Sequence, residues 1–195
     1  MNVLSHRIRL LPIALAFAYA AISIAPAIYA APQSMDKTVM VGGAAMYPTR
    51  NIIQNAVNSK DHTTLVAAVK AAGLVDTLEG AGPFTVFAPT NEAFAALPAG
   101  TVDTLLKPAN KATLVSILTY HVVPGRLTAS DLAAKVAAGG GKADLKTVEG
   151  ENLTVSKDSS GWAITDAKGN TAHVTIGDVM QSNGVIHVID KVLMP

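Results

Sequence analysis

The sequence predicts an α+β domain in which helices come first and a mainly antiparallel sheet follows. Between residues 49 and 138, apolar side chains recur with the three- and four-residue spacing of amphipathic helices. Between residues 145 and 193, short runs of β-forming residues alternate with glycine-containing turns. A chain whose helices precede its strands in this way is typical of α+β proteins.

The composition is that of a globular single domain. The 195 residues are about one domain long, half are hydrophobic and 5% are aromatic, so Ala, Val, Leu and Ile must build most of the core. The absence of cysteine excludes disulfides, thiolate metal sites and a cysteine nucleophile. The formal charge is +1 and no stripe of Lys and Arg is present, so no nucleic-acid partner is expected.

Residues 1–30 have the pattern of a secretory signal peptide. Arg7 and Arg9 supply a positive start, residues 10–24 form an apolar run, and small residues follow up to Ala30. We expect cleavage near Ala30 and a secreted or periplasmic protein with no membrane span in its mature part. An uncleaved anchor is the alternative, but the run contains Pro12 and is shorter than the about 20 apolar residues that a spanning helix needs.

Residues 31–48 are predicted to form an N-terminal arm that packs on a domain covering 49–195. Gly42, Gly43 and Pro48 leave no clear period in this stretch. The first part of the domain then predicts two amphipathic helices, with Asp61 as the N-cap of the second and Gly73 as its end. Their apolar faces are Ile52, Ile53, Ala56 and Val57 in the first helix, and Leu65, Ala68, Val69 and Ala72 in the second. A short helical segment is expected at 76–78.

A buried strand and four further helices are predicted next. The strand covers 83–89, because residues 84–87 favour β-structure and Gly82 and Pro89 bound them. Two short helices are expected at 90–97 and 102–106. A third is expected from Asn110 as N-cap to Pro124, and its apolar face is Leu114, Ile117, Leu118 and His121. The fourth is expected from Ser130 as N-cap to the glycines 139–141. The remaining strands are expected at 145–148, 153–157, 162–166, 172–176 and 185–193, with turns between them.

Three segments of the chain resemble the signature elements of fasciclin domains. Residues 85–94 read TVFAPTNEAF, residues 184–195 read GVIHVIDKVLMP, and between them residues 120–125 read YHVVPG. The segments occur in the order and at the separations of that family, and the resemblance covers about residues 50–195. It implies a β-wedge of mainly antiparallel strands packed against several α-helices, and roles in cell adhesion, matrix contact or surface association. Family membership determines the fold better than the partner.

We interpret the first and second signature boxes, 85–94 and 184–195, as structural. Pro89 ends a strand, Thr90 or Asn91 accepts hydrogen bonds at the start of the next helix, and Phe94 packs back on the strand. Direct contact with a ligand is the alternative for the first box. The second box has the continuous apolar pattern of a central strand that is buried on both faces. The signature residues given this structural role are Thr85, Phe87, Pro89, Thr90, Asn91, Phe94, Gly184, His187 and Asp190.

Asp178, Val179 and Met180 are candidates for partner binding. They resemble an Asp-Ile-Met integrin-recognition motif that precedes the second box in animal members of the family, with Val179 in place of isoleucine and Gly177 in place of a proline. An exposed carboxylate beside an apolar pair could complete a metal-dependent receptor site. The alternative is a turn at the end of a strand, with Asp178 solvated.

Tyr120 and His121 are a second pair of candidates. Aliphatic residues flank them, as in an adhesive tyrosine–histidine motif that some animal members of the family use. However, His121 falls on the apolar face of its predicted helix. A buried imidazole needs hydrogen-bond partners, so a core histidine with satisfied hydrogen bonds is the favoured interpretation.

The sequence contains none of the common catalytic patterns. It has no Gly-x-Ser-x-Gly elbow, and the histidines at 62, 121, 173 and 187 lack metal-binding spacing, so no enzyme, metal or cofactor is expected. The leading hypothesis is a secreted or periplasmic adhesion module that recognises a cell-surface protein or polysaccharide. The alternative is an extracytoplasmic binder of a small apolar or lipid-like ligand, held in a groove between the helices and the wedge.

Overall fold

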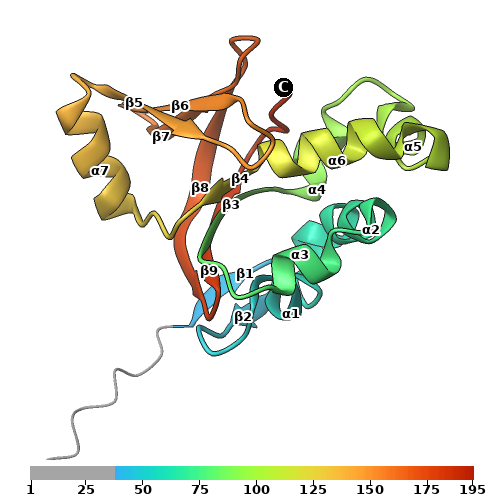
Figure 1. The fold of residues 1–195 in the computed structure, drawn as a ribbon. Helices are drawn as coiled ribbons and strands as arrows, with labels where there is room; N and C mark the ends of the chain where they lie inside the picture. The colour runs from blue at the N-terminus through green and yellow to red at the C-terminus, as the bar shows by residue number, and fades with distance from the viewer. Residues whose placement is uncertain (1–37) are drawn as a thin grey trace, which may run out of the picture. The chain divides into compact units, whose positions relative to one another are not determined.

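The computed structural model describes residues 38–195, and the predicted signal peptide and residues 31–37 of the predicted arm lie outside the described residues (Figure 1). Helices and a large sheet confirm the α+β prediction. The helices are α1 (Ile52–Ala56), α2 (Thr63–Ala72), α3 (Val75–Glu79), α4 (Asn91–Ala95), α5 (Thr101–Leu105), α6 (Lys111–Tyr120) and α7 (Ala129–Ala138), with 3-10 turns η1 (Lys60–His62) and η2 (Pro108–Asn110). The strands are β1 (Val39–Val41), β2 (Ala44–Met46), β3 (Phe84–Pro89), β4 (Val122–Pro124), β5 (Lys142–Lys146), β6 (Asn152–Asp158), β7 (Gly161–Thr165), β8 (Thr171–Gln181) and β9 (Gly184–Ile189).

The main sheet of the described region has the strand order β4-β3-β9-β8-β7-β6-β5. Strands β3 and β9 run parallel, and every other neighbouring pair runs antiparallel, so the mainly antiparallel sheet is confirmed. The first and second signature boxes therefore lie side by side, with Thr85 opposite Val185 and Phe87 opposite His187. All six residues of β9 are buried, as its continuous apolar sequence predicts for a central strand.

Two apolar cores lie on the two faces of the β3–β9 pair. Side chains alternate along a strand, so Val86 and Ile186 enter one core while Phe87 and Ile189 enter the other. Helices α1 to α4 and most of α6 cover the first core. Helix α7 covers the second core and packs on β5 and β6 (Figure 1).

Part of the predicted arm forms regular structure. Strands β1 and β2 form an antiparallel hairpin, in which Val39 pairs with Met46. Val41 and Met46 are buried in the first core. Gly42 and Gly43, which interrupt any period in the sequence, supply the positive φ angles of the turn (57° and 74°). The three-residue strands are too short to show a period.

None of the N-caps predicted at Asp61, Asn110 and Ser130 caps its helix through its side chain. The N-cap of α7 is Thr128, whose hydroxyl accepts from the Asp131 N–H while Asp131 accepts from the Thr128 N–H, and Ser130 lies inside the helix. Asn110 stands at the start of α6 but caps no N–H group there, because its side chain donates to the Thr104 carbonyl instead. Asp61 lies within η1, and His62 precedes α2.

Several strands differ from the predicted ranges. Strand β5 covers Lys142–Lys146 instead of 145–148, and β9 ends at Ile189 instead of 193. Residues 122–124, predicted as the end of a helix, form the edge strand β4, and a proline is tolerated there because an edge strand leaves one side unpaired. Strand β8 continues through Gly177 to Gln181, because the strand bulges there rather than ending.

Candidate interaction site at the β8 bulge

Asp178 lies at an irregularity of β8. The pairing of β8 with β9 shifts register between Ile176 and Val179, which leaves Asp178 out of the ladder. Its φ angle is 55°, and within residues 38–195 it is the one non-glycine residue with a positive φ. Aspartate enters this left-handed region more readily than most side chains do. The bulge leaves the Asp178 side chain exposed.

The bulge holds Asp178 by two hydrogen bonds. One carboxylate oxygen, Oδ1, accepts a hydrogen bond from the backbone N–H of Ala129, the first residue of α7, at 2.7 Å. The Asp178 backbone N–H donates to Nδ1 of His187 at 3.3 Å. Oδ2 makes no hydrogen bond with any residue of 38–195. The carboxylate is thus fixed through one oxygen and presents the other to the surroundings.

His187 must be neutral to accept this hydrogen bond. Its Nε2–H donates to the Leu127 carbonyl at 2.8 Å, which leaves Nδ1 as the acceptor. The side chain is fully buried and stacks on Phe87, with 5.7 Å between ring centroids. Burial lowers the pKa of His187, against the smaller raising effects of the Leu127 carbonyl and the Asp178 carboxylate.

The loop before α7, residues 125–128, is held from both signature boxes. Thr85 of β3 donates to the Gly125 carbonyl at 2.6 Å and accepts from the Leu127 N–H at 2.9 Å. His187 of β9 donates a hydrogen bond to the backbone carbonyl of the same Leu127. Arg126 extends outward and donates to the carbonyls of Gln181 and Ser182, both at 3.1 Å. The loop, the bulge and the start of α7 therefore form one rigid surface around Asp178.

The apolar part of the predicted binding motif is mostly inaccessible. Val179 is 1% exposed and belongs to the first core, and Met180 is half-buried. The carboxylate of the motif is exposed as predicted, but the neighbouring Val179 is not accessible to a partner. What the motif offers a partner is the Asp178 carboxylate and part of Met180.

The adhesive interpretation of Tyr120 and His121 conflicts with their burial. Tyr120 is fully buried, and its hydroxyl donates to the Asn152 carbonyl at 3.1 Å and accepts from the Ala167 N–H at 2.9 Å. His121 is 3% exposed. Its Nδ1–H donates to the Ile117 carbonyl at 2.8 Å and its Nε2 accepts from the Leu193 N–H at 3.0 Å. Burial lowers the pKa of His121 to about 4, so the histidine is a neutral core residue with both nitrogens satisfied.

The first box also organises two helices. Pro89 ends β3, and Thr90 accepts from the Ala93 N–H and caps α4, whose buried Phe94 packs in the first core. Asn91 reaches α2 instead, where its Oδ1 accepts from the Thr64 N–H at 3.0 Å and its Nδ2 donates to the Lys60 carbonyl at 2.7 Å. Asn91 thus replaces the missing N-cap side chain of α2.

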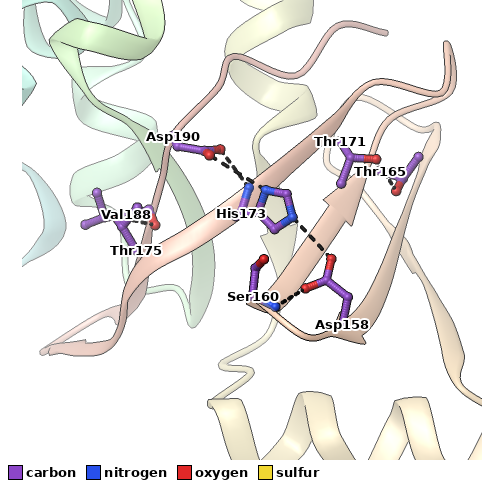
Figure 2. Close-up of polar contacts among 8 residues, drawn as sticks. All are labelled: Asp158, Ser160, Thr165, Thr171, His173, Thr175, Val188 and Asp190. Carbon is purple, nitrogen blue, oxygen red and sulfur yellow. Dashed lines mark hydrogen bonds and ion pairs between the residues drawn. The ribbon is translucent and has the colours of Figure 1, made fainter.

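The remaining signature residues hold strands together. The β-carbon of any residue other than glycine at 184 would meet the Phe84 carbonyl oxygen at 2.1 Å, which explains glycine there. Asp190 accepts from the His173 N–H at 2.7 Å and so joins the end of β9 to β8. The His173 ring lies between Asp190 and Asp158, and its Nε2 is 3.2 Å from Oδ2 of Asp158 (Figure 2). Within residues 38–195, no three His, Asp or Glu side chains are arranged to hold a metal ion.

Sequence reasoning missed several polar residues that support these elements. Asn183 accepts from the Ile52 N–H at 3.0 Å and donates to the Leu78 carbonyl at 2.7 Å, which ties the β8–β9 turn to α1 and α3. Asn55 and Gln181 hydrogen-bond each other in the interior. His62 is buried although it lies outside the helical period of α2. Apolar periodicity marks buried apolar residues only, so it gives no signal for Asn55 in α1, for Gln181 in β8 or for a turn residue such as Asn183.

These features define an α+β module in which two signature strands lie side by side at the centre of the sheet and hold the loop that supports Asp178. A sequence profile of the Fasciclin domain matches residues 60–195, and the chain belongs to the fasciclin family. No helix of the described region is long and apolar enough to cross a membrane.

Relatives and a solved structure agree with this assignment. The chain is 50% identical over 164 residues to Protein sll1483 of Synechocystis sp., covering 84% of this chain and 83% of that protein. It is 38% identical over 160 residues to Cell surface glycolipoprotein MPB83 of Mycobacterium bovis, covering 80% of this chain and 64% of that protein. A FAS1 domain pair from the insect cell adhesion molecule fasciclin I shares the fold, with a TM-score of 0.68 at 19% identity over 81% of this chain and 58% of that chain.

Proposed function

We propose that this protein is an extracytoplasmic, non-catalytic adhesion module that recognises a cell-surface protein or polysaccharide through the surface around Asp178. The observation that carries the proposal is the Asp178 carboxylate, which is exposed and held by Ala129 and the His187-supported bulge. A rigid acceptor loses little conformational entropy on binding, which favours affinity. The insect adhesion molecule that shares the fold and the relative named as a cell-surface protein support the class of function.

A cell-surface binding assay tests this proposal. Labelled protein is applied to cells and to immobilised surface polysaccharides, and we expect saturable binding. Asp178→Asn keeps a side-chain oxygen for the Ala129 N–H and tolerates the positive φ, so it removes the charge with little structural change. Asp103→Asn, at an exposed carboxylate on α5, is the matched control.

The two variants separate a specific site from general charge effects. We expect Asp178→Asn to weaken binding about tenfold or more, as for the loss of a charged hydrogen bond at an interface, while Asp103→Asn binds as the unchanged protein does. Equal binding by all three proteins would remove Asp178 from the site. Saturable binding by none of them would contradict the adhesive function itself.

A second candidate function, the binding of a small apolar molecule, is supported by two cavities in the first core. The first cavity lies among α1, α2, α3 and β3, and the second lies between α1, the β1–β2 hairpin and β9. Aliphatic side chains provide nearly all of their walls. A molecule that stays bound when the purified protein is weighed by native mass spectrometry would support this function.

A further inference from the structure

His62 carries an unpartnered polar atom at the wall of the second cavity. The side chain is 3% exposed, and Nδ1 lies 2.9 Å from the Ser59 hydroxyl. Nε2 is buried and makes no hydrogen bond with any residue of 38–195, and no other buried side-chain nitrogen or oxygen of this region lacks a partner. Buried polar groups are nearly always paired, so an unpaired one indicates a missing partner.

The cavity around His62 is otherwise apolar. Its other lining residues are Val41, Met46, Ile52, Ala56, Leu65, Val86, Ala88, Val179 and Ile186. A water molecule is retained in a cavity when it finds two to four polar partners, and here His62 is the one polar side chain of the wall. A water here would find only Nε2 and the nearby Ala88 carbonyl as partners, so an apolar molecule with a single polar group suits this cavity better.

The two cavities adjoin. Ile52, Ala56, Leu65 and Val86 line both of them. The first cavity has a volume of about 40 Å³ and the second of about 30 Å³. One water-sized atom needs about 10–15 Å³, so the pair holds about five to seven heavy atoms. The first cavity also reaches Lys70, which is exposed and marks a route to solvent.

We infer that the two adjoining cavities connect and together bind a short-chain aliphatic alcohol, with its alkyl chain among the aliphatic side chains and its hydroxyl on Nε2 of His62. This inference rests on the second candidate function and names its ligand class. A hydroxyl group both donates and accepts, so it satisfies Nε2 whichever ring nitrogen carries the proton. The adhesive surface at Asp178 is not involved.

The charge state of His62 agrees with a neutral ligand. Burial lowers the pKa of His62, and the Ala88 carbonyl and Asp61 oppose this effect only in part. The Ala88 carbonyl is near enough to act on the pKa but makes no hydrogen bond with Nε2. A neutral imidazole in an apolar wall has no charge to offer a carboxylate, so a neutral hydroxyl suits Nε2 better than a carboxylate does.

Titrations with 1-pentanol and 1-chloropentane test the inference. The two probes have six heavy atoms each and differ in the group that reaches His62. We expect both to shift backbone amide NMR signals of the shared cavity wall in the full-length protein. We expect only 1-pentanol to shift the ¹⁵N signal of His62 Nε2. This measurement needs no variant, so it does not depend on whether a variant folds.

Two variants locate the contributions of chain and hydroxyl. His62→Leu removes the polar group, and we expect the affinity for 1-pentanol relative to 1-chloropentane to fall about threefold to tenfold, as for the loss of one neutral hydrogen bond. Ala56→Leu fills the junction of the cavities, and we expect it to weaken the binding of both probes about tenfold or more. Unchanged melting temperatures show that the variants are folded.

Each outcome has a distinct meaning. If both probes bind but the His62 signal does not respond to 1-pentanol, the alcohol assignment fails while apolar binding stands. If neither probe binds, or the shifts lie away from the cavity wall, both the ligand class and the second candidate function fail. The adhesive function is tested separately through Asp178 and is unaffected by either result.

Discussion

The buried His121 predicts a loss of stability in mild acid. Its imidazole is neutral in the folded protein, with a pKa lowered by burial from 6.5 to about 4. Between these two values the unfolded chain binds more protons than the folded one, so stability rises with pH. The contribution is complete above pH 6.5 and is lost as the pH falls toward 4. One pKa unit corresponds to about 1.4 kcal/mol. Because the unfolded chain is half protonated at pH 6.5 and the folded protein is partly protonated at pH 4.5, a fall between these values removes about 2 kcal/mol.

Urea denaturation at pH 7.0 and pH 4.5 measures this loss. Burial also lowers the pKa of His62 and of His187, so both act in the same direction. Carboxylates with a lowered pKa, such as those of Asp131 and Asp158, lose their contribution to stability mainly below about pH 3.8. They therefore add little to the change between pH 7.0 and pH 4.5. An NMR titration of the His121 ring assigns the effect to this residue.

The expected titration midpoint of His121 lies near 4. His121→Asn keeps a donor near the Ile117 carbonyl but does not titrate, so we expect a less stable protein with a smaller pH dependence. A His121 ring that titrates near 6.5, or a free energy of unfolding that is equal at the two pH values, would refute the reasoning.

Two further predictions concern the helix caps. Thr128→Ala removes the capping box of α7 and should lower the free energy of unfolding by about 0.5–2 kcal/mol in urea denaturation. Ser130→Ala, the control, should change it by less than about 0.5 kcal/mol. Equal effects of the two variants would contradict the assignment of Thr128 as the cap. Asn91→Ala removes the side chain that holds the start of α2 and should lower the free energy of unfolding by about 1–2 kcal/mol in the same assay. Asn110→Ala removes one hydrogen bond to Thr104 and should lower it by less. A smaller decrease for Asn91→Ala than for Asn110→Ala would show that α2 does not depend on Asn91.

The elements that the sequence predicts well are those in which one pattern dominates. Helix α2 has a clear apolar stripe and ends at Gly73, whose φ of 74° suits glycine. Strands β3 and β9 are apolar on both faces because both faces are buried. Short elements are predicted poorly, because β1, β2 and β4 have three residues each and cannot show a period.

The candidate site was less predictable, because its geometry comes from contacts distant in the sequence. Ala129 is 49 residues from Asp178, and its N–H holds the carboxylate. In the sequence alone, the Tyr120–His121 pair resembles an adhesive motif. In the structure, both side chains at the end of α6 point into the protein, where backbone carbonyl and N–H groups hydrogen-bond the tyrosine hydroxyl and both histidine nitrogens. A sequence motif does not show which of its residues face solvent.

The alternation of side chains along β8 and β9 separates the two proposed sites. Val179 and Ile186 point into the first core and line the second cavity, whereas His187 points to the other face and supports the bulge at Asp178. The two sites thus share a backbone but not their side chains. Substitutions at residues that share no side-chain partners usually have additive effects. We therefore expect Asp178→Asn to leave alcohol binding unchanged and Ala56→Leu to leave surface binding unchanged, and coupling between them would indicate that β8 or β9 shifts when a cavity fills.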